Sequence, residues 1–121
     1  MRRDRAAAPT LRTAFPSVAL IHIDLVFEDH PGRAPAPQSF VLHPPARAFF
    51  EFSCPYANCE GRFDLTTQVH AAVEHASSKA TGQLDCQGLR PKGSALRQPC
   101  GLLLRFAIAA QQQTQAEPFE A

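Results

Sequence analysis

The stretch FEFSCPYANCEGRFDL, residues 50–65, joins an apolar segment to a helix start through two cysteines, Cys54 and Cys59. Two further cysteines follow, Cys86 in LDCQGLR and Cys100 in QPCGLLLR. In a chain of 121 residues, four cysteines can form disulfides, lie buried as free thiols, or bind a metal ion together. The choice among these three determines what holds the fold together.

Glycine follows three of the four cysteines within two positions, at residues 61, 88 and 101. A metal-bound thiolate is a strong hydrogen-bond acceptor, and a glycine with positive φ can turn backbone N–H groups toward the sulfur. Neither a core thiol nor a disulfide requires glycine at these positions. We therefore predict that the four cysteines hold a structural Zn²⁺ ion, and core thiols or disulfides are the alternatives. The predicted ligands are Cys54, Cys59, Cys86 and Cys100.

Two histidines, His70 and His75, offer a different ligand set together with Cys54 and Cys59. Residues five apart lie about 140° apart around a regular helix, so these two histidines would not face one metal. That set would also leave the other two cysteines without a role. We interpret both histidines as surface helix residues, and a mixed set of three cysteines with His70 stays open.

Alternating apolar residues predict five strands, at 17–27, 39–43, 46–54, 79–86 and 101–110. Helical spacing of apolar residues predicts one amphipathic helix within 64–77, with Asp64 or Thr66 as its N-cap. The order β-β-β-α-β-β indicates an α+β fold, in which an antiparallel sheet of about five strands carries the helix and the metal site crosslinks them. We expect one domain over residues 17–110, between a disordered basic N-terminus (1–16) and a disordered Gln-rich tail (111–121).

Charge is distributed unevenly along the chain, although the net charge is only +1. Residues 79–105 carry five basic side chains against one acidic side chain, and three of these lie in the segment between the last two cysteines. This segment is predicted to be a loop anchored at both ends, and Arg90, Lys92 and Arg97 would contact a nucleic-acid backbone there. The alternative partner is a protein, bound at an apolar patch that includes Phe49.

Familiar catalytic patterns are missing from the sequence. HAAVEH, residues 70–75, has the wrong spacing for a zinc hydrolase helix, and neither a P-loop nor a G-x-S-x-G motif occurs. His22, Asp24 and Glu51 are expected to share an ordinary solvated sheet face. A binding module therefore fits the sequence better than an enzyme, and a redox-responsive thiol protein and a metal-dependent enzyme are the alternatives.

The N-terminal residues indicate a cytoplasmic protein with reduced thiols. No apolar run approaches the roughly 20 residues that a membrane helix needs. Arg12 and Pro16 interrupt any apolar signal-peptide core. An intracellular setting disfavours disulfides.

Residues 54–101, with cysteines closely followed by glycine, resemble zinc-ribbon-like, zinc-knuckle and treble-clef-like domains. The resemblance implies a structural zinc ion that holds a small β-rich fold, which would bind nucleic acid or protein. The chain departs from those families in the four residues between Cys54 and Cys59 and in the thirteen residues between Cys86 and Cys100.

Overall fold

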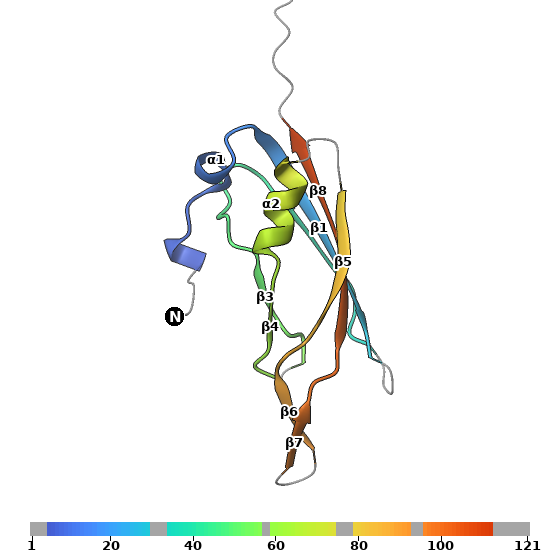
Figure 1. The fold of residues 1–121 in the computed structure, drawn as a ribbon. Coiled ribbons are helices and arrows are strands. Elements are labelled where there is room, and N and C mark those ends of the chain that lie inside the picture. The colour runs from blue at the N-terminus through green and yellow to red at the C-terminus, as the bar shows by residue number, and fades with distance from the viewer. Residues whose placement is uncertain (1–4, 30–33, 57–58, 75–78, 93–95, 113–121) are drawn as a thin grey trace, which may run out of the picture.

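A four-stranded antiparallel sheet forms the larger layer of the fold (Figure 1). The computed structural model describes residues 5–29, 34–56, 59–74, 79–92 and 96–112. The strand order is β2-β1-β8-β5, and the strands are β2 (Gln38–Leu42), β1 (Val18–Glu28), β8 (Leu103–Gln112) and β5 (Lys79–Asp85).

The remaining elements are short. Helix α2 (Thr66–Glu74) is preceded by the two-stranded sheet of β3 (Glu51–Ser53) and β4 (Arg62–Asp64). A second two-stranded sheet consists of β6 (Leu89–Lys92) and β7 (Leu96–Pro99). A 3-10 turn η1 (Arg5–Ala7) and the helix α1 (Leu11–Ala14) precede the first strand.

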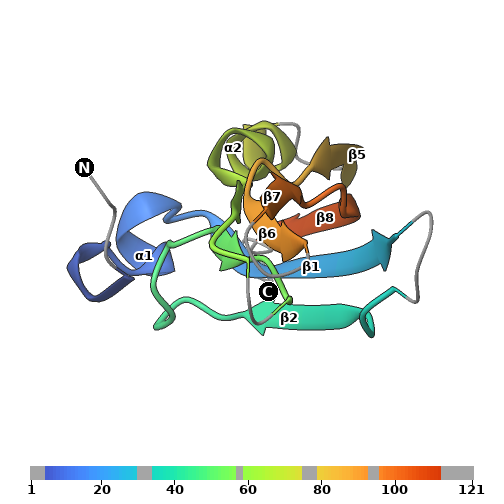
Figure 2. The ribbon, with the colours of Figure 1, turned by 90° about the horizontal axis from the view of Figure 1, so that it is seen from below.

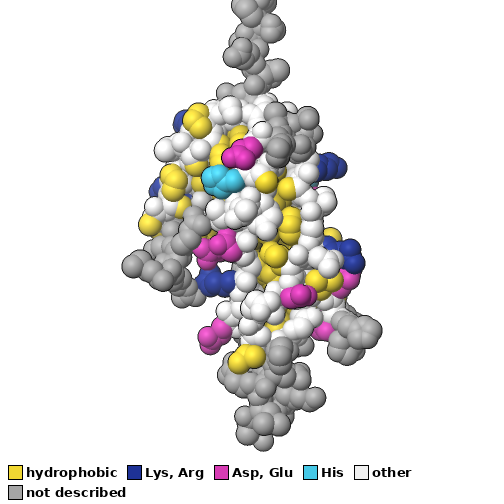
Figure 3. All heavy atoms as spheres, in the orientation of Figure 1, with side chains coloured by type: hydrophobic (Ala, Val, Ile, Leu, Met, Phe, Trp, Pro, Cys, Tyr) yellow, Lys and Arg dark blue, Asp and Glu magenta, His cyan; other side chains and the backbone are white. Residues whose placement is uncertain are grey.

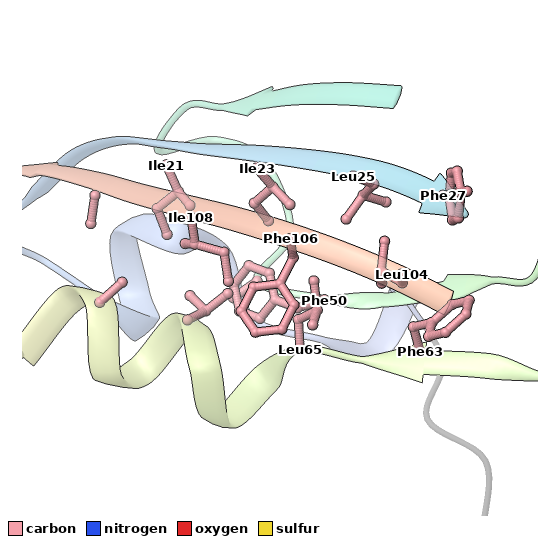
Figure 4. Packing of buried hydrophobic residues seen from close by; sticks show 14 of the residues in the cluster. Ile21, Ile23, Leu25, Phe27, Phe50, Phe63, Leu65, Leu104, Phe106 and Ile108 are labelled. Carbon is pink, nitrogen blue, oxygen red and sulfur yellow. The ribbon is translucent and has the colours of Figure 1, made fainter. Parts of the chain in front are cut away.

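Strands β1 and β8 supply most of the sheet's buried face because their apolar residues alternate in matching register. Ile23 pairs with Ile108 and Leu25 with Phe106, and all four side chains are buried. Figure 4 shows these side chains pointing from the sheet toward Phe50 and the α2–β4 layer. The alternation of apolar residues that predicts the first and last strands therefore corresponds to a buried face of each.

Helix α2 and the β3–β4 ribbon cover the same face of the sheet (Figures 1 and 2). Val69 and Ala72 of α2 are buried in the core, as the helical spacing predicts. Asp64 Oδ1 accepts hydrogen bonds from the backbone N–H and the hydroxyl of Thr66, which satisfies a donor at the start of the helix.

The α+β class and the antiparallel sheet are confirmed, but the predicted number and order of strands are wrong. The third predicted strand is shorter than expected, and it pairs with β4 rather than with the main sheet. The reason is that the turn at Cys54 reverses the chain, so that Phe63 returns opposite Phe52. The predicted loop between Cys86 and Cys100 forms the β6–β7 ribbon.

The elements η1 and α1 lie within residues 1–16, the segment for which the sequence predicts disorder. Leu11 and Phe15 are buried in the core cluster. The Leu11 N–H donates to Ala46 O, and the Ala48 N–H donates to Pro9 O, so this segment is bonded to residues 46–48. At the other end, residues 111–112 belong to β8, and residues 113–121 of the predicted tail lie outside the described residues.

Candidate metal centre

The four cysteines come from three separate segments and meet at one buried point. Cys54 follows β3, Cys59 precedes β4, Cys86 follows β5 and Cys100 follows β7. Their Sγ atoms all lie within 4.8 Å of one another, and no cysteine is more than 8% exposed. This cluster could hold a metal ion.

The separation of the sulfur atoms fits a metal better than it fits disulfides. Two of these distances are 3.5 Å between Cys59 Sγ and Cys86 Sγ and 3.7 Å between Cys54 Sγ and Cys100 Sγ. Sulfur atoms about 2.3 Å from a tetrahedral ion lie about 3.8 Å apart, whereas a disulfide requires about 2.05 Å. All four cysteines are free thiols.

Two turns of matching geometry present the sulfur atoms. The Gly61 N–H donates to Cys59 Sγ at 3.3 Å, and the Gly88 N–H donates to Cys86 Sγ at 3.4 Å. Both sulfurs therefore accept a backbone hydrogen bond of the kind that stabilises a metal-bound thiolate. The predicted orientation of the N–H groups toward sulfur is confirmed at these two glycines.

The same two glycines also connect each turn to its second cysteine. The Cys54 N–H donates to Gly61 O and the Cys100 N–H donates to Gly88 O, both at 2.9 Å. Each half of the site thus consists of a Cys-x-Gly turn bonded through its glycine carbonyl to another cysteine. This repetition makes the centre approximately two-fold symmetric in its hydrogen bonding.

Close contact between the halves, rather than positive φ, explains the glycines at 61 and 88. A Cβ at Gly88 would lie 2.6 Å from Gly61 N and 2.7 Å from Cys59 Sγ, and one at Gly61 would lie 2.3 Å from Cys86 Sγ. Among the described glycines only Gly101 has positive φ, at 74°. The prediction that positive φ requires these glycines is therefore wrong at Gly61 and Gly88. Glycine is required there because no space remains for a side chain.

Burial sets the protonation of two of the thiols. It raises the pKa of Cys54 well above its ordinary value and raises the pKa of Cys86 to about 11, although the Gly88 N–H opposes the rise at Cys86. At Cys59 burial acts in the same direction, but the Gly61 N–H and the neighbouring thiols outweigh it and lower the pKa. A metal that binds four thiolates would displace protons from the buried thiols.

His70, one of the two histidines considered as ligands, does not join the cluster. His70 is exposed on α2, and its ring centroid lies 4.9 Å from that of Phe15 in an edge-on contact. His75 lies outside the described residues. The group that could hold a metal in the described part of the chain contains cysteines alone.

The basic residues Arg90, Lys92 and Arg97 lie on the β6–β7 ribbon, of which the structure describes the backbone. Strand register pairs Arg90 with Gln98 and pairs Arg97 with Pro91. Because cross-strand partners share a face and successive residues alternate, Arg90 and Lys92 belong to one face of the ribbon and Arg97 to the other. The register therefore does not bring the three residues onto one face.

The other candidate residues lie in ordinary structural environments. His22 Nε2 lies 3.2 Å from Asp24 Oδ1 on the outer face of β1, and Ser39 also donates to that carboxylate. Glu51 lies on β3 in the opposite layer and does not join them on that sheet face. Phe49 is buried, so an exposed patch containing it, as expected for a protein partner, does not exist.

One contact near the site was not anticipated. The Tyr56 hydroxyl, in the turn between Cys54 and Cys59, donates to Asp29 Oδ2 just after β1. It links the turn between the first two cysteines to the end of the main sheet. Nothing in the sequence indicates this pair, because the two residues are 27 positions apart.

Comparison with known proteins does not extend these observations. No family model, no curated protein and no solved structure matches the chain. Within the described residues, no helix is long and apolar enough to cross a membrane.

Proposed function

We propose that this protein is a binding module whose fold is held by a structural zinc ion at Cys54, Cys59, Cys86 and Cys100. The observation that carries the proposal is the convergence of four buried Sγ atoms within 4.8 Å of one another. Tetrahedral all-thiolate sites are typical of structural zinc, and iron is the other metal that such a donor set accepts. With four protein ligands the ion has no open position for water or substrate, which argues against a catalytic role.

Zinc at this site would join the β6–β7 ribbon to the β3–β4 ribbon. The β3–β4 ribbon and the β6–β7 ribbon each have only two strands, and isolated two-stranded sheets are marginally stable in water. Cys54 and Cys59 flank the turn of the first ribbon, and Cys86 and Cys100 lie at the base of the second. The ion would thereby fix both ribbons to each other and to the end of the sheet.

The β6–β7 ribbon is the part of the module that we assign to partner binding, with a nucleic-acid backbone as the partner. It extends from the end of the molecule opposite α1 (Figure 1) and carries Arg90, Lys92 and Arg97. On the face seen in Figure 3, the described Lys and Arg side chains are interspersed with acidic ones and form no continuous basic patch. A basic ribbon that projects from the body can contact phosphates on both of its faces. The nucleic-acid partner is therefore compatible with Arg90 and Lys92 on one face and Arg97 on the other.

The test is the salt dependence of binding to double-stranded DNA of arbitrary sequence. Arg90→Ala/Lys92→Ala/Arg97→Ala should reduce the slope of log K against log salt by about 0.9 for each phosphate that the protein no longer neutralises, up to about 2.7. The matched control, Arg12→Ala/Lys79→Ala/Arg105→Ala, removes three basic side chains outside the ribbon and should keep most of the slope. Equal slopes for the two variants, or no DNA binding by the wild-type protein, would reject the nucleic-acid partner.

One observation favours a second function, a redox-responsive zinc site. An open cavity of about 340 Å³, lined by Ser53, Cys59, Glu60, Gly61 and Arg62, gives access to the Cys59 side of the cluster. Peroxide would oxidise the Cys59 thiolate to a sulfenic acid and release hydroxide, and attack by the Cys86 thiolate would form the disulfide and release a second hydroxide. This function predicts zinc release by peroxide that reductant reverses, and retention of zinc under peroxide would rule it out.

A further inference from the structure

Strand β5 is an open edge of the main sheet in the part of the chain that the structure describes. It is the last strand in the order β2-β1-β8-β5, and five of its seven residues are exposed. One of the five is Gly82, at the middle of the strand. Because glycine has no side chain, its exposure means that the backbone itself is accessible at this edge.

The opposite edge is protected where β5 is not. Strand β2 has five residues and lies between Pro37 and the pair Pro44–Pro45. Short length and flanking proline are common devices against edge-to-edge pairing. Strand β5 (Lys79–Asp85) is longer, with seven residues, and has no flanking proline. It begins with a positively charged lysine and ends with a negatively charged aspartate.

We propose that β5 pairs antiparallel with β5 of a second copy of this chain, so that two sheets join into one. An edge strand directs the N–H and C=O of every second residue outward. Antiparallel self-pairing therefore requires that two opposed residues both have odd numbers or both have even numbers. The register that places Gly82 opposite the partner's Gly82 satisfies this requirement and aligns all seven residues. It also places Lys79 opposite the partner's Asp85, and the two-fold symmetry repeats that pair at the other end.

The side chains of the inward face agree with the same register. Ala80 and Leu84 are half-buried and pack against the core. In this register Ala80 of each copy would lie opposite Leu84 of the other copy. Gly82 lies over the ring of Phe106, so the centre of the joined strands carries no side chain between them. A seven-residue strand pair is a small interface, which makes the expected dimer weak and concentration-dependent.

The experiment is sedimentation velocity on the full chain, from about 10 µM to about 1 mM, the range expected of a weak interface. The wild-type protein should shift with concentration toward twice the 13.2 kDa chain mass. Lys79→Asp and Asp85→Lys each oppose like charges twice per dimer and should each weaken association about tenfold. The double variant Lys79→Asp/Asp85→Lys restores opposite charges and should return to within about threefold of the wild type.

Arg12→Asp is the matched control for Lys79→Asp, because it makes the same change from a positive to a negative charge at an exposed residue of α1. It should leave association unchanged. Circular dichroism checks that each variant is folded, and both substituted β5 residues are exposed. A wild-type protein that stays monomeric throughout the range overturns the proposal. So does a dimer that tolerates both single reversals, or a double variant that associates no better than either single one.

Discussion

At the scale of single residues, the two glycines at 61 and 88 are the most constrained positions of the metal centre. Each donates its N–H to a sulfur and accepts from the N–H of another cysteine, and each lies against the backbone of the other. The halves of the site therefore meet at glycine rather than at side chains. Any added side chain must push the halves apart.

Gly88→Ala should lower the affinity for zinc by about 10–100-fold, the range typical of changes that displace the hydrogen-bonding partners of ligands. The reason is that its Cβ would lie 2.6 Å from Gly61 N, a contact that only a backbone shift can relieve. Competition with a chromophoric chelator measures the affinity. Gln87→Ala changes an exposed residue of the same turn and is the control; equal affinities for the two variants would contradict this account of the glycines.

The sequence was informative about these residues but not about their geometry. Cysteine spacing and the following glycines pointed to a shared site, because each cysteine and the glycine that follows it lie close together in the chain. The contact between Gly61 and Gly88 could not be foreseen, since it depends on how two turns 27 residues apart approach each other. Positive φ was the wrong reason for both glycines, and it applies to Gly101 alone among the described glycines.

At the scale of elements, α1 contributes to the core, although the amino-acid composition of the N-terminal segment did not indicate this. Arginines and alanines surround Leu11, whose side chain is 1% exposed. Strands β1 and β8 were predictable because apolar residues alternate regularly along them. Strands β6 and β7 contain Pro91 and Pro99, and their apolar residues follow no regular spacing. A two-stranded ribbon tolerates proline where no ladder hydrogen bond is needed, so the usual argument against strands did not apply.

Leu11→Ala should lower the free energy of unfolding by about 2–5 kcal/mol, because it leaves a cavity in the core cluster to which Leu11 belongs. Urea unfolding of the zinc-loaded protein measures the change. Arg12→Ala alters the next, exposed residue and should have little effect. A change below about 0.5 kcal/mol for both variants would mean that the N-terminal segment does not belong to the core.

Removal of zinc should affect the two ribbons before the main sheet. The base of β6–β7 lies at Cys86 and Cys100, whereas β1 and β8 pair over ten residues and form the centre of the core. Hydrogen exchange after chelation should show fast exchange of the β6 and β7 amides while the β1–β8 amides remain protected. Protection of β6 and β7 that persists without metal would show that the ribbon is stable by itself.

At the scale of the whole molecule, the sheet with its helix forms one region, and the cysteine cluster with the β6–β7 ribbon forms the other. The apolar core joins β1, β8 and α2, and it includes the four cysteines and Phe63 of β4. We propose that partner binding belongs to the second region, and this assignment depends on an ion bound by the four cysteines.

The decisive measurement is the metal content, by inductively coupled plasma mass spectrometry, of protein purified under reducing conditions without added metal. We predict one zinc per chain, and loss of that zinc in Cys86→Ser. Leu11→Ala, destabilised but with all four cysteines intact, should retain the zinc and so separates loss of a ligand from loss of stability. A wild-type chain that contains no zinc and keeps its fold in the presence of chelator would contradict the proposed centre.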